Sequence, residues 1–138
     1  MLPGLLSCAV MATPDEPLVP TAPEFFVRDI ERSVAFYTER LGFTVLRQEP
    51  DFAVVALGKS HVLLAAEAHT SRQWLDAGPR GVGLNVRIMV DDDAVYRRAQ
   101  AGGVPITQEI ASRSYGLRDF IIVDPNGFML RFAQAITN

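Results

Sequence analysis

One pattern of apolar segments and helix signals occurs twice in this chain, and this repetition most limits how the chain folds. In the first half, an extended apolar segment at Pro23–Val27 leads into an amphipathic helix that ends at Gly42. In the second half, Leu84–Val90 leads into a helix that ends at Gly102-Gly103. Two apolar strands are predicted after each helix: Phe52–Leu57, His61–Ala66, Arg118–Val123 and Phe128–Ala133. Neither half can cover its own sheet, so the repetition predicts one domain of two paired modules with a cleft between the sheets.

Capping and turn residues set the limits of these elements. Asp29 is placed to cap the first helix, because its carboxylate can accept from the free amides of the first turn. Gly42 supplies the left-handed residue that ends a helix. The aspartates Asp91-Asp92-Asp93 could suggest a metal site, but at the start of a helix they are typical of a cap with solvated neighbours. Asp124-Pro125-Asn126-Gly127 predicts a tight turn, since Asn and Gly both tolerate positive φ.

Composition limits the classes of function. With 138 residues, 49% hydrophobic and 21% charged, the chain has the length and balance of a single globular domain. Its net charge of -3 and the absence of a basic stripe argue against nucleic-acid binding. A single cysteine, Cys8, excludes a disulfide framework. No apolar run reaches the length of about 20 residues that a membrane helix needs, so we expect a cytoplasmic protein without a membrane partner.

The predicted domain organisation separates a leader from the fold. Residues 1–20 are interpreted as a flexible leader that the fold does not need, because the stretch Thr13–Pro20 contains three prolines. Residues 21–138 form the single domain. Within it, module one covers about residues 22–68, a linker covers 69–82, and module two covers about 83–134.

Two motifs resemble a known superfamily. Val27-Arg28-Asp29-Ile30-Glu31-Arg32-Ser33-Val34-Ala35-Phe36-Tyr37, followed by Leu41-Gly42-Phe43, is similar to the opening motif of the vicinal oxygen chelate superfamily. The closing segment, Tyr115 to Phe120 and on to Asp124-Pro125-Asn126-Gly127, is similar as well. That superfamily includes glyoxalase I, extradiol dioxygenases, fosfomycin-modifying enzymes and bleomycin resistance proteins. The resemblance spans about Ala22 to Gln134 and implies an α+β fold, in which two tandem βαβββ modules form a curved mixed β-sheet cleft with flanking helices.

The resemblance also locates the four positions where enzymes of this superfamily hold a divalent metal. They fall on Ala22, on or beside Leu64, on Asn85 and on Arg131. Alanine and leucine offer no ligand atom, and a guanidinium group is a permanent cation that repels a metal. In that superfamily the positions that fall on Ala22 and Asn85 are usually histidine, and neither His61 nor His69 lies on the strands of those two positions. We therefore expect no metal and no cofactor.

Strand alternation predicts which side chains would line the cleft. The first strand presents Glu24 and Phe26, the strand that opens the second module presents Asn85, Arg87 and Met89, and the last strand presents Arg131. Two further residues, Trp74 in the linker and Tyr115 before a strand, are expected at the rim. Buried charges must be paired or reserved for a ligand. Either Glu24 pairs with Arg131 or Arg87, or at least one arginine holds an anionic or polar ligand.

The resulting prediction is a metal-independent small-molecule binding protein of the bleomycin-resistance type. It would be a homodimer that sequesters or carries an amphipathic ligand, and its role would be in antibiotic resistance. The ligand would lie against Phe26, Phe128 and Met89. Two alternatives stay open: a glyoxalase-like lyase, isomerase or dioxygenase with a divergent active site, in which Glu24 could act as a base, and an interaction module that offers a sheet edge to another protein.

Overall fold

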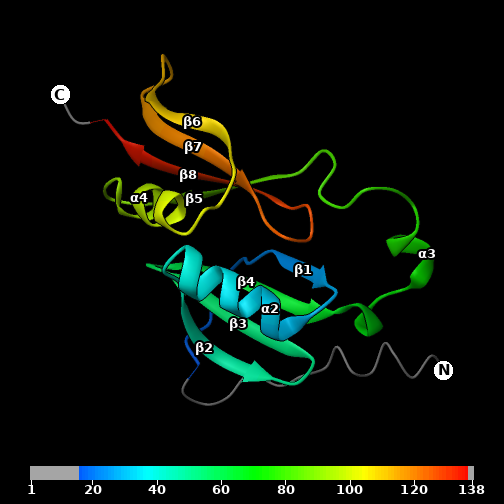
Figure 1. The fold of residues 1–138 in the computed structure, drawn as a ribbon. Coiled ribbons are helices and arrows are strands. Elements are labelled where there is room, and N and C mark those ends of the chain that lie inside the picture. The colour runs from blue at the N-terminus through cyan, green and yellow to red at the C-terminus, as the bar shows by residue number, and fades with distance from the viewer. Residues whose placement is uncertain (1–15, 137–138) are drawn as a thin grey trace.

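Two four-stranded mixed sheets form the frame of the molecule (Figure 1). The computed structural model describes residues 16–136. The first sheet has the order β1-β4-β3-β2 and the second has the order β5-β8-β7-β6. The strands are β1 Glu24–Val27, β2 Thr44–Glu49, β3 Phe52–Leu57, β4 Ser60–Ala66, β5 Asn85–Met89, β6 Ile106–Ser112, β7 Leu117–Val123 and β8 Met129–Ala135. β1 runs parallel to β4 and β5 runs parallel to β8, so the predicted tandem α+β architecture is confirmed.

The first helix differs from the single helix predicted up to Gly42. It is α-helical over α2, Ile30–Ala35, and continues as a π-helical turn over η1, Phe36–Arg40. The Thr38 hydroxyl donates to the carbonyl of Val34 at 2.8 Å, an interaction that competes with the regular helical ladder. The two ends match the prediction: Asp29 caps the helix by accepting from the amide of Arg32, and Gly42 follows with a φ of 87°.

The helices in the second half are short. α4 covers Ala94–Ala101 and ends at Gly102. Its N-cap residue, Asp93, makes no capping hydrogen bond with its side chain, whereas the preceding Asp92 accepts from the amide of Ala94 at 2.8 Å. The linker contains η2, Glu67–His69, and α3, Arg72–Leu75. Among the described residues, no helix combines the length and the apolar character needed to cross a membrane.

One hydrophobic core joins the two modules. The helix-covered faces of both sheets contribute to it, with Phe25 and Leu64 from the first sheet and Ile88 and Phe132 from the second. α4 lies beside η1, since Arg98 donates to the backbone of η1, and Figure 1 shows α4 on the side of the second sheet that faces the first module. Core side chains and helices fill the space between these faces. The surfaces left for a ligand cleft are the opposite faces, which we call the outer faces of the two sheets.

The β7–β8 turn and the linker hold the two modules together. Asp124 accepts from the amides of Asn126 and Phe128, and it also accepts from the Tyr37 hydroxyl at 2.9 Å. Gly127 has a φ of 101°, whereas Asn126 does not have the positive φ that the turn pattern allowed. A Cβ atom at Gly81 would overlap the carbonyl oxygen of Gly127, so the linker passes the turn at backbone contact.

The end of the predicted leader contacts the outer face of the first sheet. Glu16 and Arg47 form an ion pair at 3.3 Å in which the two side chains are only 5% and 7% exposed. Residues 17–19 and Ala22 line a cavity there together with Phe52 and Leu63. Residues 1–15, on which the rest of the leader prediction falls, lie outside the described part of the chain.

Candidate functional site

A mostly apolar cavity of about 420 Å³ lies where the linker passes β1 and the start of β8. Phe26 of β1, Trp74 and Leu75 of the linker, and Phe128 line it. Phe128 is fixed from behind, because its ring stacks on Phe25 with centroids 4.1 Å apart. Trp74 is 77% exposed, so its indole forms a wall that a ligand could cover. The cavity suits the flat apolar part of a small molecule.

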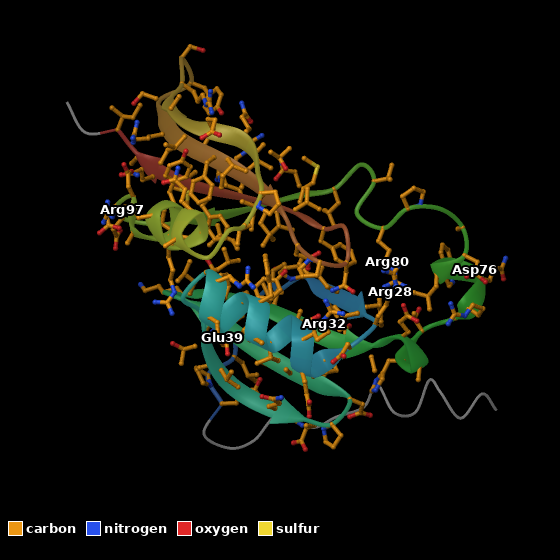
Figure 2. All side chains as sticks on the ribbon, in the orientation of Figure 1. Arg28, Arg32, Glu39, Asp76, Arg80 and Arg97 are labelled. Atoms are coloured by element: carbon orange, nitrogen blue, oxygen red, sulfur yellow. The ribbon has the colours of Figure 1, made fainter. Side chains whose placement is uncertain are left out.

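Charged groups surround the linker side of this cavity. Arg80 also lines it, donates to the carbonyl oxygen of Phe26 at 3.0 Å and forms an ion pair with Glu67. Figure 2 shows Arg80 and Arg28 lying close together, and Arg28 also reaches Glu67, at 3.9 Å. The hydrogen bond from Arg80 lowers the pKa of Glu67 below its usual value. These contacts fix the linker that carries Trp74.

A second cluster of charged groups lies on the outer face of the second sheet. Its centre is Asp119, whose side chain is fully buried. Arg113 Nε donates to Asp119 Oδ1 at 2.9 Å and the Tyr115 hydroxyl donates to Oδ2 at 2.6 Å. Burial raises the pKa of Asp119, but these two hydrogen bonds, together with the positive charges of Arg113 and Arg131, outweigh it and hold the pKa below its usual value. The hydrogen bond to Asp119 raises the pKa of Tyr115.

The structure divides the predicted site residues between two surfaces. Phe26 and Trp74 meet in the apolar cavity. On the other surface, five predicted residues share the outer face of the second sheet or its rim: Asn85, Arg87, Met89, Arg131 and Tyr115. Glu24 is exposed on the outer face of the first sheet. One chain alone therefore does not gather all of the predicted residues around a single ligand.

The first of the two alternatives for the arginines, a pairing with Glu24, is not found in the described part of the chain. Glu24 forms no ion pair with Arg131 or Arg87 between residues 16 and 136. Arg131 instead faces Asp119, with Nε 4.0 Å from Oδ2. That distance is too long for a hydrogen bond, and the buried Nε donates to no other atom in the described residues.

The four metal positions of the superfamily do not offer a ligand set. Leu64 points into the core, so the outer-face neighbours at that position are Leu63 and Ala65, neither of which can bind a metal. Ala22 and Arg131 offer no atom that can coordinate a metal either, so the side-chain amide of Asn85 is the one possible ligand at these four positions. Within residues 16–136, no group of three His, Cys, Asp or Glu side chains could hold a metal ion elsewhere. The residues present do not fit the metal that the superfamily implies.

Sequence reasoning missed Asp119, Arg113 and Arg80. Strand alternation could have found Asp119, because it shares a face with Ile121 and Val123 and lies within the Tyr115–Phe120 motif. Arg80 gave no such signal, since it lies in an irregular linker whose path depends on the contact between Gly81 and Gly127.

Comparison with known proteins gives the family. The Glyoxalase/Bleomycin resistance protein/Dioxygenase superfamily matches residues 19–132. The chain belongs to this superfamily. Among curated members, a bleomycin resistance protein of Geobacillus stearothermophilus is 28% identical over 131 residues, which cover 86% of this chain and 98% of that protein. A bleomycin resistance protein of Staphylococcus aureus is similar to the same extent.

Solved structures of the superfamily share the fold. TioX from Micromonospora sp. ML1 has a TM-score of 0.66 at 22% identity, covering 83% of this chain and 97% of that chain. A glyoxalase/bleomycin resistance protein/dioxygenase family enzyme from Burkholderia phytofirmans PsJN has a TM-score of 0.68, with the same identity and coverage. At this level of identity the similarity shows the architecture alone.

Proposed function

We propose that this chain is a metal-independent small-molecule binding protein that sequesters or carries an amphipathic ligand. The observation that carries the proposal is the apolar cavity between Phe26, Trp74 and Phe128. Its volume of about 420 Å³ lies in the range of small-molecule sites, and an exposed tryptophan beside it gives a surface on which aromatic groups can stack. The relatives named as bleomycin resistance proteins support a role of this class.

The lack of a complete ligand set at the metal positions supports binding rather than metal-assisted chemistry. Three of the four positions carry alanine, arginine or an aliphatic side chain within the described range. Elemental analysis of the purified protein should therefore find far less than one equivalent of zinc, nickel, iron or manganese per chain. One tightly bound equivalent that survives dialysis would contradict this part of the proposal.

We propose further that two copies are needed to complete the site. The predicted ligand-binding residues occupy outer faces on different sheets, which point away from the shared core. A second copy that places its first sheet opposite the second sheet of its neighbour would bring Phe26 of one chain close to Arg131 of the other. A two-fold axis would then generate two equal clefts.

The single tryptophan makes the proposal directly testable. Trp74 is the only tryptophan of the chain and lines the cavity, so its fluorescence reports on that site alone. Titration with a panel of amphipathic aromatic compounds should shift the emission to shorter wavelength, because a bound ligand excludes water from the indole.

A matched variant tests whether the signal comes from the cavity. Phe26→Ala removes a wall of the cavity and should weaken binding by about tenfold or more, as the loss of an aromatic contact predicts. Tyr96→Ala removes an aromatic side chain from α4, away from the cavity, and should leave the affinity unchanged. A panel in which no compound stabilises the protein or changes the Trp74 emission would refute the binding function.

A further inference from the structure

Two arginines stand side by side on the outer face of the second sheet. Arg87 of β5 and Arg131 of β8 are register partners in a parallel ladder, so their side chains leave the same face of neighbouring strands. Strands lie about 4.8 Å apart, and two guanidinium groups at such spacing repel one another unless an anion lies between or beside them. Arg87 is exposed and forms no ion pair within residues 16–136.

The nearby carboxylate does not neutralise this pair. Asp119 already accepts from Arg113 and from Tyr115, and the guanidinium of Arg113 also donates to the carbonyl oxygen of Asp119. Arg131 remains at 4.0 Å from the carboxylate, and its Nε is buried without a hydrogen-bond acceptor in the described structure. Asp119 therefore faces Arg131 without accepting a hydrogen bond from it, and the Arg131 side chain, which is one third exposed, can still reach another anion with its terminal nitrogens.

Apolar side chains border the two arginines on the same face. Met89 follows Arg87 by two residues, Met129 precedes Arg131 by two, and Ile121 is the register partner of Arg131 on β7. Met89 is 45% exposed and Tyr115 is 56% exposed. The two guanidinium groups at the centre of this surface can thus form charge-assisted hydrogen bonds, and the polarisable apolar side chains around them can contact the rest of a ligand.

We infer that this arginine pair binds the acidic group of the ligand, which is a small amphipathic organic anion such as a carboxylate, sulfonate or phosphate ester. The inference rests on the small-molecule function proposed above and specifies the chemical class of the ligand. Arg87 and Arg131 hold the acidic group, the methionines and Tyr115 contact the part next to it, and the aromatic cavity of the facing chain receives the apolar end.

A pair of dyes that differ in one group tests this assignment. Anilinonaphthalene sulfonate carries a sulfonate on an aromatic body, and N-phenylnaphthylamine is the same aromatic body without the charge. The wild-type protein should bind the sulfonate at least about tenfold more tightly than the neutral dye, since each charge-assisted hydrogen bond contributes about a factor of ten or more. The preference should shrink as salt is added.

Substitution of the arginines should remove the preference. Arg131→Met and Arg87→Met should each weaken sulfonate binding by about tenfold and leave the binding of the neutral dye unchanged. Arg97→Met is the matched control, because Arg97 is an exposed arginine that projects from α4 (Figure 2). If Arg131→Met fails to fold, Arg87→Met still decides the question, since Arg87 is exposed and unpaired in the described structure.

The outcomes separate the inference from the proposed function. If both dyes bind equally well to the wild type and to the arginine variants, the anion assignment is wrong and the small-molecule function stands. If neither dye binds, both are wrong. If Arg131→Met disrupts a dimer while sulfonate binding by the remaining protein is unchanged, the arginines serve the contact between copies, and the anion assignment is again wrong.

Discussion

Asp119 is a buried carboxylate at the centre of the charged cluster on the outer face of the second sheet. Its neighbours in this cluster are Arg113, Tyr115 and Arg131. A buried carboxylate is stable only while its hydrogen bonds compensate for the loss of water. Arg113 and Tyr115 supply that compensation, and together they keep the pKa of Asp119 below its usual value despite burial. Folding therefore favours the ionised form of the Asp119 carboxylate.

Asp119→Asn should destabilise the protein in a pH-dependent way. The folded-state pKa lies below the unfolded value of about 3.9, so Asp119 contributes stability above that value and loses it as the pH falls through the folded pKa. At neutral pH the variant should lose about 2–3 kcal/mol, because Arg113 and Tyr115 lose their charged acceptor. Urea unfolding at neutral pH and near pH 3 should show a difference that shrinks in acid. A difference independent of pH would mean that Asp119 is not ionised in the folded protein.

The segment that begins at Glu16 packs on the first sheet, although the sequence predicts a flexible leader over residues 1–20. Glu16 reaches Arg47 of β2 in a contact that water scarcely touches, and the Arg47 guanidinium also lies 5.7 Å from the ring centre of Phe52. Arg47 has a second partner, Glu49, whose side chain is 44% exposed. Arg47 thus has one buried acidic partner, Glu16, and one more exposed partner, Glu49, so the contributions of the two ion pairs to stability can be compared at a single arginine.

Glu16→Gln should lower stability more than Glu49→Gln. The first change removes a charge whose partner is nearly buried and should cost about 1–3 kcal/mol. The second removes a solvent-screened contact and should cost less than about 1 kcal/mol. Thermal unfolding of both variants measures the difference. Equal melting temperatures for Glu16→Gln and the wild type would support the prediction that residues 1–20 are dispensable for the fold.

The linker depends on the backbone at Gly81. Its φ of 75° and its contact with Gly127 each oppose a side chain. Gly81→Ala should therefore cost more than Gly83→Ala, where φ is 77° but a Cβ atom would meet nothing within 4 Å and only the left-handed strain of about 1–2 kcal/mol remains. Gly78→Ala, with open space and no positive φ, should be close to neutral. The melting temperature should therefore be highest for Gly78→Ala, lower for Gly83→Ala and lowest for Gly81→Ala. Any other order would show that the linker does not depend on the contact between Gly81 and Gly127.

The same elements explain what could be predicted from the sequence. Strands β1, β3, β4, β5, β7 and β8 carry the apolar runs and turn signals that strand prediction uses, and their predicted positions agree closely with the structure. The individual strand assignments omitted β2 and β6, which lie at sheet edges, have interrupted registers and carry mixed polar sequences. Alternation predicted that Arg87 and Arg131 share a face with their neighbours on β5 and β8, as the register shows, but the meeting of Trp74 with Phe26 depends on the linker path, which no local pattern encodes.

At the scale of the molecule, the shared core decides how copies can associate. The helix-covered faces are already buried against one another, so within the described residues the outer face of the second sheet is a surface that a partner could cover. The outer face of the second sheet carries exposed Met89 and Val123. Covering such apolar groups is favourable, at about 25 cal/mol per Å² of apolar surface removed from water.

We therefore predict a homodimer in solution. Light scattering at micromolar concentration should give twice the mass of one 15.2 kDa chain. Met89→Glu should shift the mass towards that of one chain, because it places an unpaired charge in the predicted contact, whereas Gln100→Glu on the exposed side of α4 should not. A wild-type protein that scatters as a single chain would exclude the dimer and, with it, a site shared between copies.

The shared core also makes the two halves of the polypeptide complementary fragments. Hydrogen bonds from the Tyr37 hydroxyl to Asp124 and from the Arg28 amide to Asn126 cross from one half to the other, as does the ring stack of Phe25 on Phe128. None of these contacts needs the intervening peptide bonds. A chain nicked by trypsin after the exposed Arg72 should thus stay together as one particle and unfold in one transition, with its continuity supplied by packing instead of covalent linkage.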